Sequence, residues 1–98
     1  MEKRTKQIAE LLKVLANENR LMIFCALMEK PLTVGEVAKH VKSISPSGLS
    51  QHLSMLKAHN ILDSKKSGQS ITYSIADHQV EEIIHVLQRY YCSSEEVI

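Results

Sequence analysis

The sequence predicts a mainly α-helical domain with one small β-hairpin, in the order α-α-α-α-β-β-α. Apolar residues recur at helical spacing in five segments, and one pair of segments has the composition of short strands. The 98 residues contain three glycines, two prolines and no repeat or low-complexity tract, so a linker has no evident place. We therefore expect residues 1–98 to form a single domain.

Two amphipathic helices open the chain. Each carries apolar residues at the i, i+3, i+4, i+7 spacing of one helix face: Ile8, Leu11, Leu12 and Leu15 in the first, and Leu21, Phe24, Cys25 and Met28 in the second. Asn17 is placed to cap the second helix. Pro31 is placed to end it, because proline disfavours helical geometry in the residue before it.

The next two helices form a helix-turn-helix pattern. Thr33 and Glu36 have capping-box spacing at the start of a short helix. Ser45 and Pro46 supply an N-cap and a first-turn proline for a helix that runs to about Ala58. Leucines at helical spacing give this helix an inward face: Leu49, Leu53 and Leu56. Two helices joined by a short polar turn are the hallmark of this motif.

A hairpin and a last helix complete the chain. The segments Ile61–Lys66 and Ser70–Ile75 read as strands joined at Ser67–Gln69, which makes this hairpin a candidate wing. Asp77 is placed to cap a final helix that ends near Cys92. Its apolar stripe comprises Val80, Ile83, Ile84, Leu87 and Tyr91. A terminal helix with such an apolar stripe usually packs against a partner.

The outer side of the helix after Pro46 is small and polar. The residues left outside are Ser47, Gly48, Ser50, Gln51, His52 and Ser54. Such a face suits a helix that enters the major groove of DNA, where Gln51 can pair bidentately with adenine. A plain solvent-exposed face is the alternative interpretation.

Charge is unevenly distributed along the chain. Residues 39–71 carry five lysines against Asp63 alone, a net charge of +4, whereas residues 72–98 carry a net charge of −4. Lys65, Lys66 and Gln69 belong to the predicted hairpin, where the lysines can contact phosphates beside the groove. Solvated lysines, or a winged-helix module that binds proteins, are the alternatives to a DNA-binding wing.

Four stretches closely resemble the ArsR/SmtB family of winged helix-turn-helix repressors: LANENRLMIF, LTVGEVAKHV, SPSGLSQHLSMLKAHNIL and QSITYSI. The resemblance runs from Leu15 to Cys92, and the serine-glutamine-histidine run is its most specific part. It implies a homodimer paired through the first and last helices, with Ser47, Ser50, Gln51 and His52 at double-stranded operator DNA. Because no apolar run approaches a membrane span, we expect a cytoplasmic protein.

The metal sites of that family do not match this sequence. One site needs a cysteine pair in the helix before the DNA-reading helix, but Thr33–Val37 has no cysteine. Of the four ligands in the final helix only Asp77 is present, because Gln79, Tyr90 and Ser93 replace the histidines. His78 and His85 read as solvated side chains, or as ligands within a dimer. We expect no metal and no other cofactor.

Cys25 and Cys92 resemble the cysteine pair of one branch of the family, typified by BigR, SqrR, YgaV and HlyU. The resemblance implies derepression by thiol oxidation or persulfidation that bridges the two. The alternative is a metal-independent regulator whose cysteines only pack. An enzyme is not expected, because the cysteines lie 67 positions apart rather than in a CxxC pair, and no hydrolytic triad or phosphate loop is evident.

Overall fold

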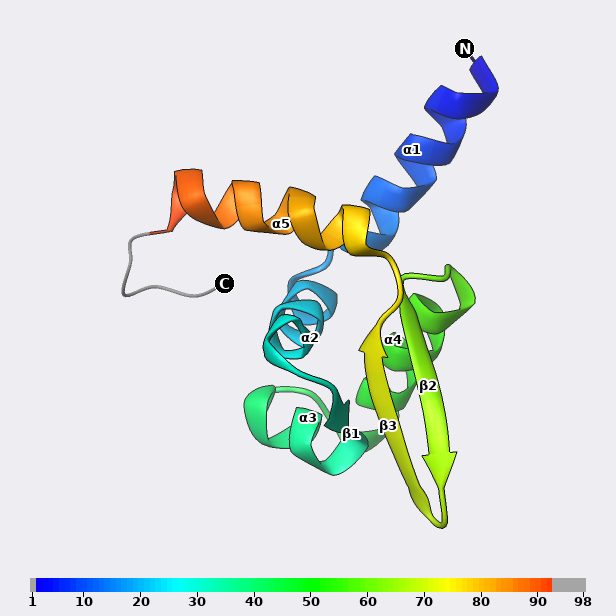
Figure 1. Cartoon of the computed structure of the whole chain (residues 1–98), viewed down its shortest axis with the longest axis vertical. Helices are drawn as coiled ribbons and strands as arrows, with labels where there is room; N and C mark the ends of the chain where they lie inside the picture. The colour runs from blue at the N-terminus through cyan, green and yellow to red at the C-terminus, as the bar shows by residue number, and fades with distance from the viewer. Residues whose placement is uncertain (1, 93–98) are drawn as a thin grey trace.

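Residues 2–92, the part of the chain that the computed structural model describes, form five helices and a three-stranded sheet (Figure 1). The elements are, in chain order, α1 (Glu2–Leu15), α2 (Glu18–Glu29), β1 (Leu32–Thr33), α3 (Val34–His40), α4 (Pro46–Ala58), β2 (Leu62–Ser67), β3 (Ser70–Ile75) and α5 (His78–Tyr91). The antiparallel sheet has the order β1-β3-β2. The expected mainly helical fold with one hairpin is confirmed.

The helix starts that the sequence predicted are confirmed, because each depends on a hydrogen bond between residues at most three positions apart. The capping side chains accept from backbone N–H groups: Asn17 from Arg20, Thr33 from Glu36, Ser45 from Gly48, and Asp77 from Gln79 and Val80. The capping box is complete, since the Glu36 carboxylate accepts from the Thr33 N–H at 2.9 Å. This backbone hydrogen bond, together with that to the Thr33 hydroxyl, lowers the pKa of Glu36.

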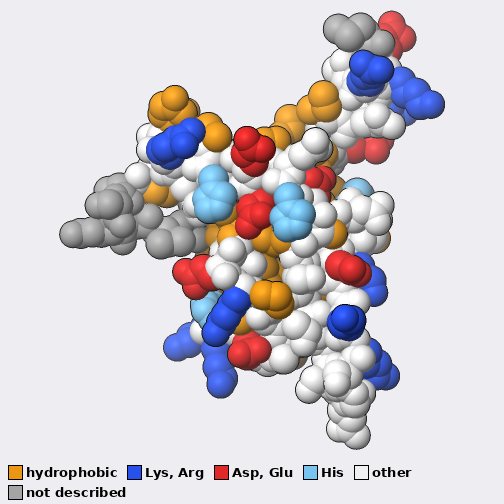
Figure 2. Space-filling view, in the orientation of Figure 1, with side chains coloured by type: hydrophobic (Ala, Val, Ile, Leu, Met, Phe, Trp, Pro, Cys, Tyr) orange, Lys and Arg blue, Asp and Glu red, His pale blue; other side chains and the backbone are white. Residues whose placement is uncertain are grey.

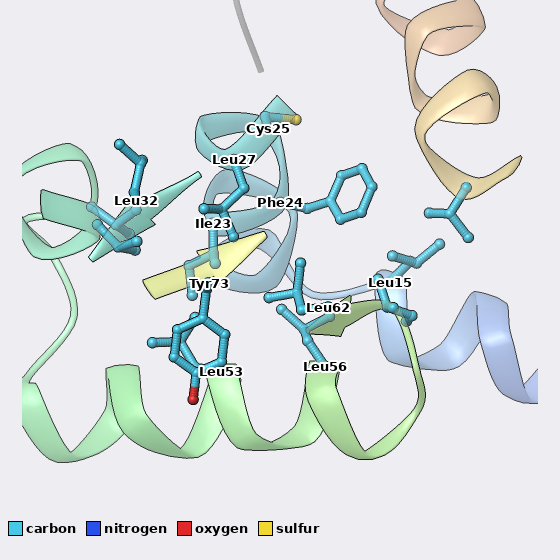
Figure 3. Packing of buried hydrophobic residues seen from close by; sticks show 14 of the residues in the cluster. Leu15, Ile23, Phe24, Cys25, Leu27, Leu32, Leu53, Leu56, Leu62 and Tyr73 are labelled. Carbon is cyan, nitrogen blue, oxygen red and sulfur yellow. The ribbon is translucent and has the colours of Figure 1, made fainter. Parts of the chain in front are cut away.

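The core surrounds α2, which is buried on more than one side. The spacing of its apolar residues predicts a single apolar face, but Ile23 and Leu27 outside that face are also buried, while Leu21 and Met28 are only half-buried. The correction follows from the topology, because α2 contacts α1, α3, α4 and β3. Figure 3 shows its side chains packed against leucines of α4, with Cys25 on the far side of the helix from them.

The hairpin differs in detail from the prediction. Strand β2 begins at Leu62 rather than Ile61 and continues through Ser67, which leaves a two-residue turn at Gly68 and Gln69. Gly68 has a φ of 62°, the left-handed region that glycine adopts without strain. Strand β1 was not predicted. Its two residues pair with β3, with Leu32 opposite Tyr73.

Helices α1 and α5 extend outward from the body of the molecule (Figure 1). Only part of their predicted apolar faces is buried, namely Leu15 of α1 and Val80 and Ile84 of α5. Val14, outside the predicted face of α1, is buried as well. Large apolar side chains remain exposed on both helices: Ile8, Leu12, Ile83, Leu87, Tyr90 and Tyr91. In the described part of the chain, no helix is long and apolar enough to cross a membrane.

Candidate nucleic-acid interface

Helix α4 presents one polar face to solvent. Its leucines, Leu49, Leu53 and Leu56, are at most 3% exposed and fix the inward side. Successive helix residues are rotated by about 100°, which places Ser47 and Gln51 on the side opposite the leucines. Both are exposed, in agreement with the sequence analysis.

The other two residues predicted on this face lie at its edges. Ser50 is exposed on the side of α4 that also carries Lys57, whereas His52 is half-buried and lies toward the opposite side. A shallow hollow runs along the exposed face, lined by Ser50, Gln51, Ser54 and Met55. Gln51 is therefore the central candidate for a base contact, and His52 is peripheral.

The hairpin carries its two lysines on opposite faces. Lys66 is paired with Ile71 and Ser64 with Tyr73, so these four side chains share the face on which Tyr73 is buried. Lys65 is paired with Thr72 and points the other way. The sequence alone does not separate the two lysines, because the strand register sets their directions. Lys65, Lys66 and Gln69 are all exposed.

A hydrogen bond fixes the hairpin relative to α4. Lys57 Nζ on α4 donates to Ser64 Oγ on β2 at 2.6 Å. Figure 2 shows several Lys and Arg side chains, with a few acidic ones among them, around the end of the molecule that carries α3 and the hairpin, and acidic and histidine side chains over α5. Within the described residues, the lysines of residues 39–71 thus lie on other elements than Asp77, Glu81 and Glu82, which belong to the start of α5.

Arg20 connects three helices through its side chain, a role that the sequence does not reveal. Its Nε donates to the carbonyl oxygen of Val14, near the end of α1, at 2.6 Å. Its Nη1 lies 3.0 Å from Met55 Sδ on α4. One side chain on α2 therefore contacts both the outward helix α1 and the polar helix α4. No local pattern signals it, because Met55 lies 35 positions away.

Cys25 and Cys92 are both free thiols, on α2 and at the C-cap of α5. Cys25 is 5% exposed, and Gln88 Nε2 donates to its Sγ at 3.7 Å. Burial raises the pKa of the Cys25 thiol to about 11, Cys92 adds to the rise, and the Gln88 hydrogen bond opposes it. Cys92 is only half-buried. Gln88 also accepts from the Cys92 backbone N–H through its carbonyl oxygen, so this residue contacts both cysteines.

The histidines of α5 do not gather a metal-ligand set. His78 Nδ1 lies 3.0 Å from Glu81 Oε1 on the same helix. Within residues 2–92, no three His, Cys, Asp or Glu side chains cluster closely enough to hold a metal ion. Ser93, one of the positions compared with the family's metal site, lies outside the described residues.

Comparison with known proteins identifies the family. Residues 17–64 match the family described as "Bacterial regulatory protein, arsR family". The transcriptional activator HlyU of Vibrio cholerae is 36% identical over 98% of this chain and 88% of its own length. The biofilm growth-associated repressor of Agrobacterium fabrum is 35% identical over 98% of this chain and 81% of its own.

Solved structures share the whole architecture. Reduced HlyU from Vibrio cholerae has a TM-score of 0.85 and 38% identity, covering 95% of this chain and 97% of that one. A winged helix-turn-helix DNA-binding domain from Mycobacterium bovis, described as homodimeric, has a TM-score of 0.79 and 25% identity, covering 91% and 82%. The fold is therefore a winged helix-turn-helix, with β2 and β3 as the wing, and the chain is a transcriptional regulator rather than an enzyme.

Proposed function

The chain belongs to the arsR family of bacterial regulatory proteins, and from this premise we propose that it is a repressor that binds operator DNA as a homodimer. The observation that carries the proposal is the exposed polar face of α4, with Gln51 at its centre and the lysine-bearing wing fixed beside it. A helix placed in the major groove reads bases with such side chains, while flanking cations contact phosphates.

The exposed apolar side chains of α1 and α5 support the homodimer. Ile8 and Leu12 on α1 are 57% and 56% exposed, and Ile83 on α5 is 50% exposed. Burying such surface against a second copy is favourable. A twofold dimer presents two α4 helices, so we expect a near-palindromic operator with half-sites about 10 base pairs apart, or a multiple of that spacing.

The test starts from an operator selected by the wild-type protein from random 30-base-pair duplexes. We expect Gln51→Ala to weaken binding to this duplex more than to a scrambled duplex, because it removes a candidate base contact worth about 1–3 kcal/mol. We expect Lys65→Ala to weaken binding to both duplexes alike. Fluorescence anisotropy measures both effects, and wild-type affinity in both variants would refute the assignment.

We further propose that oxidation or persulfidation bridges Cys25 and Cys92 and releases DNA. Cys92 reacts first, because it is the accessible thiol, whereas the raised pKa of Cys25 keeps that thiol protonated at neutral pH. Once Cys92 is oxidised, Cys25 loses its proton as it attacks. The closed bridge would tie the end of α5 to α2, and α5 carries part of the proposed dimer surface.

Two classes of oxidant give a balanced reaction. A hydroperoxide ROOH oxidises the Cys92 thiolate to a sulfenic acid and leaves as ROH, and Cys25 then displaces water to form the disulfide. A persulfide RSSH transfers its outer sulfur to Cys92 and leaves as RSH. Cys25 then attacks the inner sulfur of the Cys92 persulfide and expels HS⁻. In both cases two thiols become one disulfide within a chain.

Serine variants separate sensing from packing. Cys25→Ser and Cys92→Ser should bind the selected operator but fail to release it after treatment with hydrogen peroxide or glutathione persulfide. Mass spectrometry of the treated wild type should show the loss of two hydrogens within one chain, or added sulfur where the Cys92 persulfide has not yet been attacked by Cys25. If both serine variants release DNA as the wild type does, the cysteines are packing residues and the switch is wrong.

A further inference from the structure

A groove separates α1 from the C-terminal half of α4. Its lining combines apolar and cationic side chains with one acid: Glu10, Lys13, Val14, Arg20, Met55 and His59. Lys13 and Arg20 are cations, and His59 becomes one when protonated. The cations and the apolar Val14 and Met55 match a sugar-phosphate chain, which offers anions linked by less polar sugars.

The guanidinium of Arg20 is held in place at this groove. Its Nε is bound to the Val14 carbonyl and its Nη1 contacts Met55 Sδ. Within residues 2–92, Nη2 has no hydrogen-bond partner. A guanidinium whose position is already fixed loses little freedom when it binds a phosphate oxygen.

The groove continues from the polar face of α4. Met55 lines both the groove and the shallow hollow that contains Gln51. Lys57, which bonds the wing, is rotated about 160° around α4 from Met55. The wing and the groove therefore flank opposite sides of the same helix, with Gln51 between them.

The groove residues of α1 and the exposed apolar residues of α1, on which the proposed dimer packs, lie on different sides of this helix. Lys13 is rotated about 140° around α1 from Ile8, and Glu10 is rotated about 160°. Ile8 and Leu12 are the exposed apolar residues of α1. A second copy packed on Ile8 would lie on the other side of this helix from Lys13 and Glu10, while Lys13 is rotated about 100° from Leu12.

We propose that the groove binds the DNA backbone through Lys13 and Arg20. The DNA strand bound there is not the one that Lys66 contacts from the face of the wing on which Tyr73 is buried. The inference depends on the proposed DNA-binding function. A helix in the major groove has one phosphate backbone on each side. On the wing side of α4, Lys66 can contact the phosphates of one DNA strand. On the groove side, Lys13 and Arg20 can contact the phosphates of the other strand.

Lys13→Gln tests the groove without disturbing the tie made by Arg20. Each phosphate contact contributes about 0.9 to the slope of log K against log salt, which is about fivefold in affinity at 0.15 M salt. Since a dimer loses two contacts, we expect about 30-fold weaker binding to the selected operator and a slope lower by about 1.8. Lys30→Gln is the matched control, because Lys30 lines a separate hollow with His78 and Glu81. It should bind as the wild type does.

Glu10→Gln gives a test of opposite sign. Removing this carboxylate from the groove should tighten binding, a gain that a misfolded variant cannot produce. A methylphosphonate series in the selected duplex then locates the contact. One neutral phosphate should weaken the wild type but not Lys13→Gln, and the phosphate coupled to Lys66→Gln should lie on the other strand.

The outcomes separate this inference from the proposed function. Wild-type affinity and salt slope in both Lys13→Gln and Glu10→Gln, with Lys65→Ala still weakened, would overturn the groove alone. Coupling of Lys13 and Lys66 to the same strand would also overturn it. A wild-type protein that selects no DNA would overturn both proposals.

Discussion

The buried thiol of Cys25 makes its reactivity steeply dependent on pH. Its pKa of about 11 compares with an ordinary value of 9.0. At pH 8 about one Cys25 in a thousand is therefore a thiolate in the folded protein, against about one in ten in the unfolded chain. Alkylation by iodoacetamide should be about a hundredfold slower in the folded protein, and should accelerate about tenfold per pH unit between pH 8 and 10.

The assay follows both cysteine peptides by mass spectrometry after timed iodoacetamide pulses, with denatured protein as the reference. Half-exposed Cys92 is the internal control. Because the folded pKa of Cys25 lies above the unfolded one, folding stability should also fall as the pH rises from about 9 to 11. Equal labelling of Cys25 and Cys92 at pH 8, without acceleration at higher pH, would refute the order of thiol reactions proposed above.

Three further predictions concern the fold and the dimer. Leu56→Ala should lower the free energy of unfolding by about 2–5 kcal/mol in urea titrations, because Leu56 is fully buried. Gly68→Ala should cost about 1 kcal/mol of backbone strain, since φ is 62° and an added Cβ meets nothing within 4 Å; thermal melts give the value. Leu12→Glu should leave the circular dichroism of the fold intact but yield monomers in sedimentation velocity, whereas an intact dimer would contradict the proposed interface.

Local hydrogen bonds made much of the fold predictable from sequence. Each N-cap side chain bonds a residue no more than three positions away, so Thr33 with Glu36 or Asp77 with Val80 is visible as a spacing. The inward leucines of α4 are also predictable, because they follow the 3.6-residue repeat of a single helix. Once that face is known, the exposure of Gln51 follows from the geometry of a single helix.

What the sequence could not supply depends on contacts between distant segments. The two residues of β1 become a strand only because β3 lies beside them. Lys65 and Lys66 separate onto two faces only when Tyr73 fixes which face is buried. Arg20 reaches Met55 across 35 positions, and this contact defines the groove at which we place the second DNA strand.

The redox proposal entails a reciprocal effect that can be measured. If the bridge between Cys25 and Cys92 lowers operator affinity a hundredfold, linkage requires that saturating operator disfavour the bridge by the same factor. For a two-electron couple this raises the reduction potential by about 60 mV. Glutathione redox titrations with and without the selected duplex measure that shift, with a scrambled duplex as control. If the bridge forms at the same potential with and without the operator, it cannot change operator affinity, however readily it closes. A modification that does not change the free-energy difference between the DNA-bound and free states leaves the binding equilibrium unchanged.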